Sequence, residues 1–294
     1  MSEISVQPRG AGETATRSTV LTRFWTQGQA KIGVGLTAVV VILAFCGPLL
    51  LPWATGYSAT EFAARPFQDA GVFGTDNLGR DVLSRFLAGG MSLILYSVLA
   101  TVFGLLLGVL FGMVSAYVGG WLDSVIMRAN DVLLAIPQLV FALLAITVLG
   151  PQPWVLIAVI AITHAPRIAR VARSAALDVK GEDYILAAEM YAMPRSRVLF
   201  REILPNITGP LAVEAGLRLT YSIGAIASLS FLGLGMQPPA ADWGLMINEN
   251  RIALAVQPWG VMLPVLAIAV LTIGTNLIAD SMARASASRN VGDA

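Results

Sequence analysis

Six apolar segments separated by polar stretches dominate the pattern of the chain. They lie near residues 32–52, 91–117, 130–150, 154–167, 211–235 and 256–279. A helix needs about 20 residues to cross the hydrocarbon core of a bilayer. The pattern therefore predicts an all-α membrane protein with six transmembrane helices. The membrane domain is expected over 31–285, with a cytoplasmic N-terminal tail over 1–30 and a C-terminal tail over 286–294.

The fourth segment is the shortest, because Pro166 and Arg167 at its end cut it short. Two interpretations stay open: the span begins directly at Gln152, or it continues past Arg167 as a helix that emerges into water. Only residues 151–153 separate this segment from the third. We therefore expect the third and fourth spans to form a tight helical hairpin.

Basic residues predict the orientation, because loops on the cytoplasmic side carry an excess of Lys and Arg. With the N-terminus inside, fourteen of the 19 basic residues lie in inside segments and four in outside segments. Both termini and the loop 168–210 are therefore expected in the cytoplasm. On the outside, residues from Val82 to Phe86 have the pattern of an amphipathic helix on the membrane surface before the second span.

Composition excludes several functions. Charged residues make up 13% of the chain and the formal net charge is +1, so nothing favours a nucleic-acid partner. The single cysteine, Cys46, and the single histidine, His164, lie in apolar runs without further ligands at suitable spacing, so we expect neither metal nor cofactor. The chain also lacks the phosphate-binding loop pattern G-x-x-x-x-G-K-[ST], so any ATP would be bound by a partner.

The loop 168–210 contains a stripe of residues at helical spacing. Tyr184, Ala187, Ala188 and Tyr191 follow the i, i+3, i+4, i+7 pattern of one helix face. Small residues beside a flat aromatic ring suit docking into a groove of another protein. Pro194 marks the expected end of this helix.

This loop resembles the cytoplasmic EAA loop of ABC import permeases, whose pattern is E-A-A, three residues, G, and a distal L-P. Ala187–Ala188 occupy the two alanine positions, and Leu204–Pro205 the distal pair. Leu186 stands where the family usually has Glu, and Ala192 where it usually has Gly. Because alanine disfavours the positive φ that glycine would supply, we expect the helix to run on to Pro194.

Two further stretches resemble the dipeptide, oligopeptide and nickel subfamily of these permeases. One is Gly74–Asp81 with Ser84–Arg85, before the second span. The other is Phe231–Gly235, followed by Pro238–Pro239 and Asp242–Gly244. The similarity covers roughly residues 30 to 285 and looks closest to the second, C-type permease subunit of peptide importers.

The resemblance implies a type I ABC importer permease, a non-catalytic multi-pass subunit of the cell membrane that translocates di- or oligopeptides. It implies four kinds of neighbour: a second homologous permease forming a heterodimer, two cytoplasmic ATPase subunits, an extracytoplasmic solute-binding protein, and membrane lipid. The residues implied in coupling to the ATPases are Tyr184, Ala187, Ala188, Tyr191, Ala192, Leu204 and Pro205. ATP-driven closure of the partners would move the 184–193 helix as a lever.

Polar residues of the fifth span are candidates for the translocation path. These are Glu214, Arg218, Ser222 and Ser228. Glu214 and Arg218 are four residues apart, so a structural ion pair is the alternative. Close helix packing is the favoured alternative for the serines.

Other polar and small residues have simpler expected roles. Asp131 is expected as an N-cap of the third span. Gly104, Gly108 and Gly112 form a small-residue ridge for helix packing, with the sister permease as a candidate partner. Three roles are open for Arg80, Asp81 and Arg85. They form a solvated ion-pair cluster, hold the surface helix against the bundle, or touch the binding protein.

Three alternatives to a peptide permease are open. An ABC permease for nickel or another small solute shares the same motifs. A secondary transporter would place ionisable groups near the midplane of several spans and would work without ATP. An intramembrane enzyme would need a catalytic constellation, for which a single histidine leaves little material.

Overall fold

The computed structural model describes residues 20–290, and residues 1–19 and 291–294 lie outside its described part. The described part of the expected N-terminal tail 1–30 begins at Val20 and is largely helical. Helix α1 spans Val20–Thr26 and α2 spans Gly28–Ala54. Phe24 and Ala30 are buried against Ala285, so apolar packing against the C-terminal helix orders this part of the expected tail.

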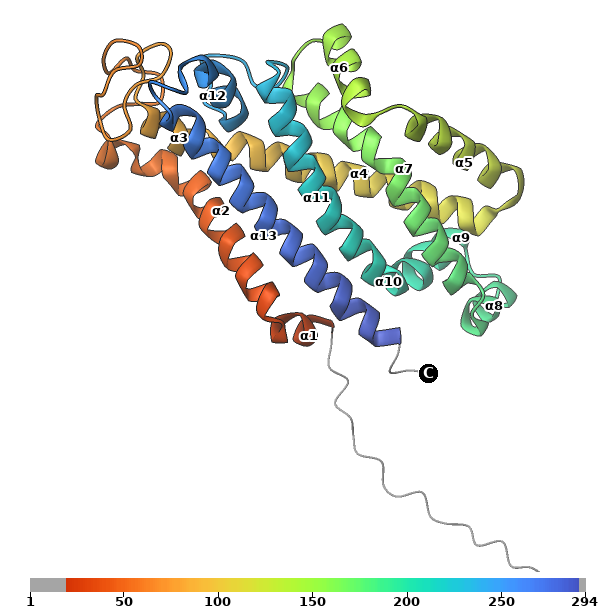
Figure 1. The fold of residues 1–294 in the computed structure, drawn as a ribbon. Helices are drawn as coiled ribbons and strands as arrows, with labels where there is room; N and C mark the ends of the chain where they lie inside the picture. The colour runs from red at the N-terminus through yellow and green to blue at the C-terminus, as the bar shows by residue number, and fades with distance from the viewer. Residues whose placement is uncertain (1–19, 291–294) are drawn as a thin grey trace, which may run out of the picture.

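Long helices form the body of the molecule over the described residues (Figure 1). They are α2, α4 (Gly90–Val118), α7 (Pro153–Lys180), α11 (Thr208–Phe231) and α13 (Trp259–Asn290). The last helix ends at Asn290, five residues beyond the expected end of the membrane domain at 285. The C-terminal tail expected from 286 is therefore helical up to Asn290.

Length and apolar composition allow four helices in the described residues to cross a membrane. These are α2, the unit formed by α3 and α4 together, α7, and α13. A fifth span is possible if the bent pair of helices over residues 120–149 counts as one. The expected fifth span, 211–235, corresponds to α11, which is not among them. That helix carries Glu214 and Arg218 within a series of Gly, Ser and Thr residues, which lowers its hydropathy.

The third expected span, 130–150, is wrong as a single straight helix. The chain forms α5 (Gly120–Ala135) and α6 (Gln138–Leu149), which meet at 87°. Proline disfavours helical geometry in the preceding residue and has no backbone N–H to donate. Accordingly Ile136, which precedes Pro137, has extended backbone angles and ends α5. Asp131 lies in the last turns of α5 and is not an N-cap.

The fourth expected segment follows the second of its two interpretations. Helix α7 begins at Pro153, runs through Pro166 and continues to Lys180 over 28 residues. Its first part is apolar and its last part carries basic residues. The prediction that Pro166 cuts the span short is wrong, because the helix continues on both sides of this proline.

Glycines of α4 allow close packing against α7. A Cβ on Gly108 would lie 2.5 Å from Ile168 Cβ, and one on Gly112 would lie 2.5 Å from the carbonyl oxygen of Ala169. The Gly104 position is also close to α7, at 3.2 Å from the Ala161 carbonyl oxygen. The glycine ridge therefore packs within the chain, and the expected contact of this ridge with a sister permease is wrong for the face that α7 covers.

Short elements occupy the two ends of the bundle (Figure 1). Residues 55–81 with α3 (Val82–Ala88), α12 (Trp243–Asn250) and η2 (Arg251–Ala253) form one end, which we call the cap. The other end holds α8 (Asp183–Met190), α9 (Arg195–Arg197), η1 (Val198–Ile203) and α10 (Leu204–Asn206). Figure 1 shows that α1 and the end of α13 lie at the same end of the bundle as α8.

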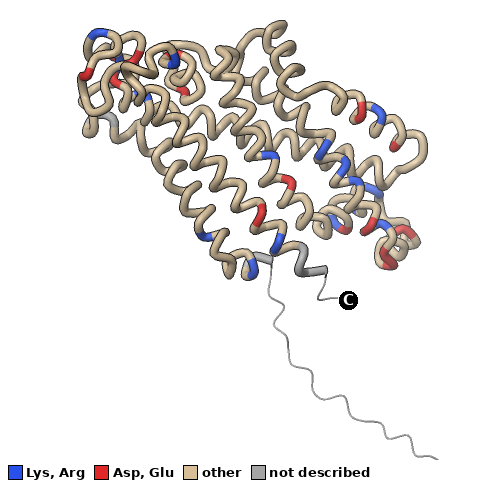
Figure 2. Tube along the Cα trace, viewed as in Figure 1, with Lys and Arg blue, Asp and Glu red and all other residues tan. Residues whose placement is uncertain are grey.

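Charged residues follow this division of the bundle. Figure 2 shows them gathered in the cap, around α8–α10 and along the last part of α7, with few in the middle of the long helices. The helix predicted on the membrane surface is α3, and that prediction is wrong. Val82, Arg85 and Phe86 of α3 are buried within the cap.

Candidate functional site

Helix α8 is held on the bundle by two apolar residues. Ile185 and Ala188 are buried in a cluster with residues of α4, α7, η1 and α11, namely Met113, Ala116, Ala172, Ala176, Val198, Ile203, Ile207 and Leu211. Ala188 is therefore not on the docking face on which the sequence pattern placed it. Its methyl group belongs to the apolar cluster that lies between α8 and the bundle.

The opposite face of α8 is open and apolar. Tyr184 and Tyr191 are 43% and 86% exposed, and Ala187 is also exposed. Leu186 and Met190 add further exposed apolar surface that the sequence pattern did not assign. An exposed apolar patch on a short helix outside the bundle is typical of a protein-docking surface.

Ala192 ends the segment in a conformation that was not expected. The helix stops at Met190, and Ala192 has a φ of 51°. The amide nitrogens of Tyr191 and Met193 donate to the carbonyl oxygens of Ala187 and Ala188, which closes the turn. The expectation that the helix runs on to Pro194 is wrong, because the alanine adopts the left-handed conformation that glycine favours.

Between α8 and α11, the short helices α9, η1 and α10 follow one another without a break. The distal pair Leu204–Pro205 forms the start of α10, directly after the π-helical η1. The Asn206 side-chain amide donates to the Tyr184 hydroxyl oxygen at 3.1 Å, across from α10 to α8. The ammonium group of Lys180 donates to the Tyr117 carbonyl oxygen at 2.8 Å and so ties the end of α7 to the end of α4. Displacement of α8 would therefore act on three long helices.

The polar face of α11 contains a buried ion pair. Arg218 Nε lies 2.8 Å from Glu214 Oε1, and both side chains are about nine-tenths buried. The Arg218 guanidinium also lies over the Tyr221 ring, 4.8 Å from its centroid, and that tyrosine is 53% exposed. Ser228 continues the same face and donates to the Gly224 carbonyl oxygen at 2.7 Å.

Ser222 faces the interior of the bundle. Its hydroxyl lies 3.0 Å from His164 Nε2 on α7 and 3.0 Å from the Thr101 hydroxyl on α4, and Ser222 is fully buried. Ser222 therefore joins three helices and is not exposed on the polar face with Tyr221. The placement of Ser222 on a translocation path is wrong in this conformation, whereas the alternative of helix packing describes it correctly.

Two ion pairs attach α5 to the second half of α7. Arg173 donates to both carboxylate oxygens of Asp123, at 2.7 Å from Nε and 2.6 Å from Nη2. Arg170 Nη2 lies 2.5 Å from Asp131 Oδ1 in an exposed pair. Asp131 thus pairs with a neighbouring helix, and the sequence pattern indicated only a cap.

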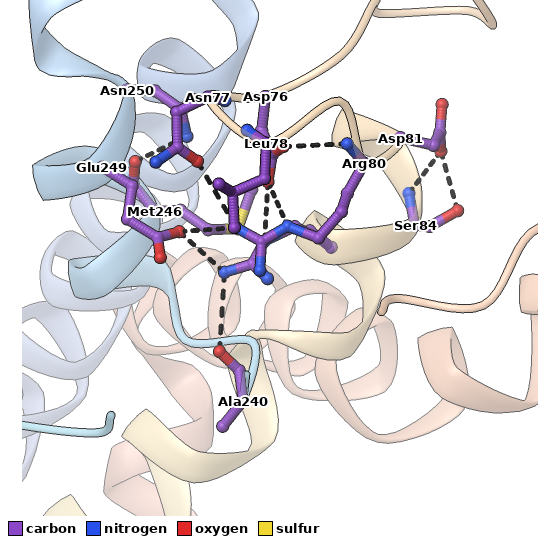
Figure 3. Close-up of polar contacts among 11 residues, drawn as sticks. Asp76, Asn77, Leu78, Arg80, Asp81, Ser84, Ala240, Met246, Glu249 and Asn250 are labelled. Atoms are coloured by element: carbon purple, nitrogen blue, oxygen red, sulfur yellow. Dashed lines mark hydrogen bonds and ion pairs between the residues drawn. The ribbon is translucent and has the colours of Figure 1, made fainter. Parts of the chain in front are cut away.

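The cap is held together by buried charges (Figure 3). Arg80 Nε lies 2.6 Å from Asp76 Oδ2, and Arg80 Nη2 lies 3.1 Å from Glu249 Oε2. Arg85 pairs with the same two carboxylates. Its Nε lies 3.4 Å from Asp76 Oδ2, and its Nη2 lies 2.9 Å from Glu249 Oε2. These side chains are at most 10% exposed. The solvated cluster considered for Arg80 and Arg85 is therefore wrong, and they fasten the 55–81 loop to α12.

Helix caps complete this end of the molecule. Asp81 accepts from the Ser84 backbone N–H and hydroxyl, both at 2.7 Å, and so caps α3. Asp242 caps α12 by accepting from the Leu245 N–H at 3.1 Å. Asparagine and aspartate side chains in such positions satisfy amides that a helix start leaves unpaired. The motifs at 74–81 and 242–244 therefore serve the cap.

The known proteins to which this chain is similar are membrane components of transport systems. Residues 104–291 match the family of the binding-protein-dependent transport system inner membrane component. The chain is 32% identical to the dipeptide transport system permease protein DppC of Alkalihalophilus pseudofirmus, over 86% of this chain and 83% of that protein. It is 33% identical to the oligopeptide transport system permease protein OppC of Bacillus subtilis, over 88% and 85%.

A further relative is the glutathione transport system permease protein GsiD of Pectobacterium atrosepticum, at 34% identity over 88% of this chain and 87% of that protein. All three similarities extend over most of both chains, so they include the cap and the long helices together. With its apolar long helices and its matched family region, this chain belongs to the binding-protein-dependent transport system inner membrane components, the permease subunits of ABC importers.

Proposed function

We propose that this chain is the permease subunit of an ATP-driven importer that carries peptides across the cytoplasmic membrane. The similarity to dipeptide, oligopeptide and glutathione transport permeases over more than four-fifths of the chain carries the proposal. The proposed neighbours are a second, homologous permease, two cytoplasmic ATPase subunits and an extracytoplasmic solute-binding protein. ATP is bound and hydrolysed by the ATPase subunits.

The proposed topology has six spans with both termini in the cytoplasm. Helix α11 is the additional span, and the bent pair α5–α6 counts as one. The excess of basic residues on the α8 side supports this orientation, because cytoplasmic loops are enriched in Lys and Arg. The arrangement of α1, α8 and the end of α13 at one end of the bundle is consistent with it (Figure 1).

Helix α8 is the proposed coupling element. Its exposed face, formed by Tyr184, Ala187 and Tyr191, would seat in a groove of an ATPase subunit. Its buried face, formed by Ile185 and Ala188, would transmit the movement to α4, α7 and α11. A rigid short helix clamped on one side and docked on the other is a two-state element that ATP binding in another chain can bias.

The face of α11 that contains Glu214, Arg218 and Ser228 is the proposed wall of the translocation path. A buried ion pair in a membrane helix is costly unless it faces a protein interior or an aqueous cavity. Tyr221 is half exposed on this face, and a Cβ on Gly224 would meet no atom within 4 Å. One chain leaves this face open, so a sister permease is needed to enclose the path.

The complete complex reconstituted in proteoliposomes tests the function. We expect a peptide to stimulate ATP hydrolysis and to accumulate inside the vesicles. Uptake of nickel ions without peptide uptake would contradict the substrate class. Accumulation that follows an ion gradient and needs no ATP would contradict the ATP-driven mechanism.

Two neighbouring alanines of α8 test the coupling element. Ala187→Arg places a charge on the exposed face, so we expect inserted protein with ATP hydrolysis uncoupled from uptake. Ala188→Arg places the same charge in the buried cluster, so we expect loss of folded protein. Ala187→Ser adds a single hydroxyl and serves as the matched control. Normal uptake by Ala187→Arg would contradict the docking role.

A further inference from the structure

Arg218 has donor groups that the protein does not use. Its Nε faces Glu214 Oε1 at 2.8 Å and is fully enclosed. Its two terminal nitrogens are not among the enclosed atoms, and within residues 20–290 they make no hydrogen bond to a protein acceptor. Arginine presents its donors as a rigid planar fork that matches a carboxylate in bidentate geometry. Arg218 therefore offers the outer side of its fork to a ligand.

The charge around this fork is positive. Arg167, exposed on α7, acts electrostatically on Arg218 across the two helices and forms no ion pair with another described residue. Glu214 is the carboxylate paired with Arg218. Two guanidinium groups and one carboxylate leave one net positive charge. Such a site attracts an anion and repels a metal cation.

The position of Arg218 suits a ligand in transit. It lies ten residues beyond the start of α11 at Thr208, which corresponds to about 15 Å along the helix. Its neighbour Tyr221 is half exposed and holds the guanidinium over its ring at 4.8 Å. About one turn beyond Tyr221, the space beside Gly224 is also open. The site is therefore far from both helix ends and accessible from the side that the chain leaves open.

We propose that Arg218 receives the free C-terminal carboxylate of the peptide during its passage. This inference rests on the proposed peptide-import function. Glu214 and the Tyr221 ring hold the guanidinium in place, so the fork need not lose much conformational freedom when the carboxylate arrives. The single net charge keeps the attraction moderate, which allows release toward the cytoplasm.

The test compares a peptide with its C-terminal amide. Uptake of each is measured in proteoliposomes that contain the complete complex, with the solute-binding protein at saturating load for both. The ratio of acid to amide uptake is then compared between the wild type and Arg218→Gln. Because the same binding protein serves both permeases, its own preference cancels. We expect the ratio to fall about tenfold or more in the variant, the effect of one charge-assisted hydrogen-bond pair.

Three further variants separate recognition from folding. Arg218→Lys keeps the charge and should retain part of the ratio. A double variant, Glu214→Gln with Arg218→Gln, removes both buried charges, so it avoids an unpaired carboxylate and should show the same fall. Arg251→Gln is the matched control, because Arg251 also lies over an aromatic ring, Phe231 at 5.6 Å, but at the cap. We expect the Arg251 variant to keep the wild-type ratio.

The outcomes distinguish this inference from the proposed function. Peptide uptake by the wild type with an equal loss of acid and amide uptake in Arg218→Gln would overturn the carboxylate site, and would assign Arg218 to structure or to an anionic lipid headgroup. The same ratio in vesicles with and without anionic lipid would support the peptide as the source of the carboxylate. Absence of any peptide uptake by the wild type would overturn the proposed function and this inference with it.

Discussion

The imidazole Nε2 of His164 and the hydroxyl of Ser222 lie 3.0 Å apart, which joins α7 and α11 in the interior of the bundle. Thr101 extends the contact to α4 by a 3.0 Å hydrogen bond with the same hydroxyl. The only histidine of the chain therefore has a structural role as a hydrogen-bond partner. An apolar bundle gains directional specificity from such a contact, because helix surfaces without polar groups can slide along one another.

The first prediction concerns this contact. Ser222→Ala removes both interhelical hydrogen bonds, so we expect a loss of about 1 kcal/mol in the free energy of unfolding. Ser228→Ala is the control, because its hydroxyl bonds only to the Gly224 carbonyl of its own helix. Thermal unfolding of the purified protein in detergent measures both. An equal loss in the two variants would show that the interhelical contact adds nothing.

The second prediction concerns the close approach of α4 and α7. Gly108→Ala would place a methyl group 2.5 Å from Ile168 Cβ and 2.7 Å from the Ala165 carbonyl oxygen. Overpacking of this kind costs about 1–3 kcal/mol. Gly35→Ala in α2 is the control, since its Cβ would meet no atom within 4 Å. We expect a lower melting temperature for the Gly108 variant only. No decrease would indicate that the two helices can move apart freely.

The third prediction concerns the buried charges of the cap. Asp76→Ala leaves Arg80 and Arg85 with only Glu249 as a counter-charge, so we expect a loss of about 3–5 kcal/mol. The exposed pair of Arg170 and Asp131 provides the comparison, and Asp131→Ala should cost less than about 1 kcal/mol.

Limited proteolysis of the 55–81 loop measures the local consequence of the Asp76 change. We expect rapid cleavage in Asp76→Ala and slow cleavage in Asp131→Ala. Equal protection of the loop in the two variants would mean that the charge cluster does not hold the cap.

The fourth prediction concerns the left-handed residue after α8. Ala192 has a φ of 51°, a conformation that costs an alanine roughly 1–2 kcal/mol and glycine little. Ala192→Gly should therefore stabilise the protein by up to about 1 kcal/mol. Ala192→Val should destabilise it, because a branched side chain is more strained there. Hydrogen exchange of the α8 amides measures both, and slower exchange in the valine variant would contradict this account.

Helical spacing along the sequence predicted the exposed positions of α8 but not its buried position at Ala188. The exposed positions Tyr184, Ala187 and Tyr191 could be predicted from helical spacing, because spacing determines which residues share a face. Spacing could not decide that Ala188 points inward, since adjacent positions at the edge of a stripe lie near both faces. The neighbouring elements α7 and η1 made that choice by packing against the buried side of α8.

Long-range pairing was the part that no local pattern could reveal. Glu214 and Arg218 are four residues apart, so their ion pair was readable from the chain. Arg85 and Glu249 are 164 residues apart, and only the approach of α12 to α3 brings their side chains to 2.9 Å. For the same reason the buried state of α3 was missed, because its covering residues come from elsewhere in the chain.

Sequence alone was enough to predict the class of the molecule, because apolar runs that are long enough to cross a bilayer form membrane helices. It also determined the motifs that mark the family. The tertiary structure decided the inward face of Ala188 and the contacts of Ser222. These features depend on which helices lie side by side, and hydrophobicity attracts every apolar face to others without specifying the neighbour.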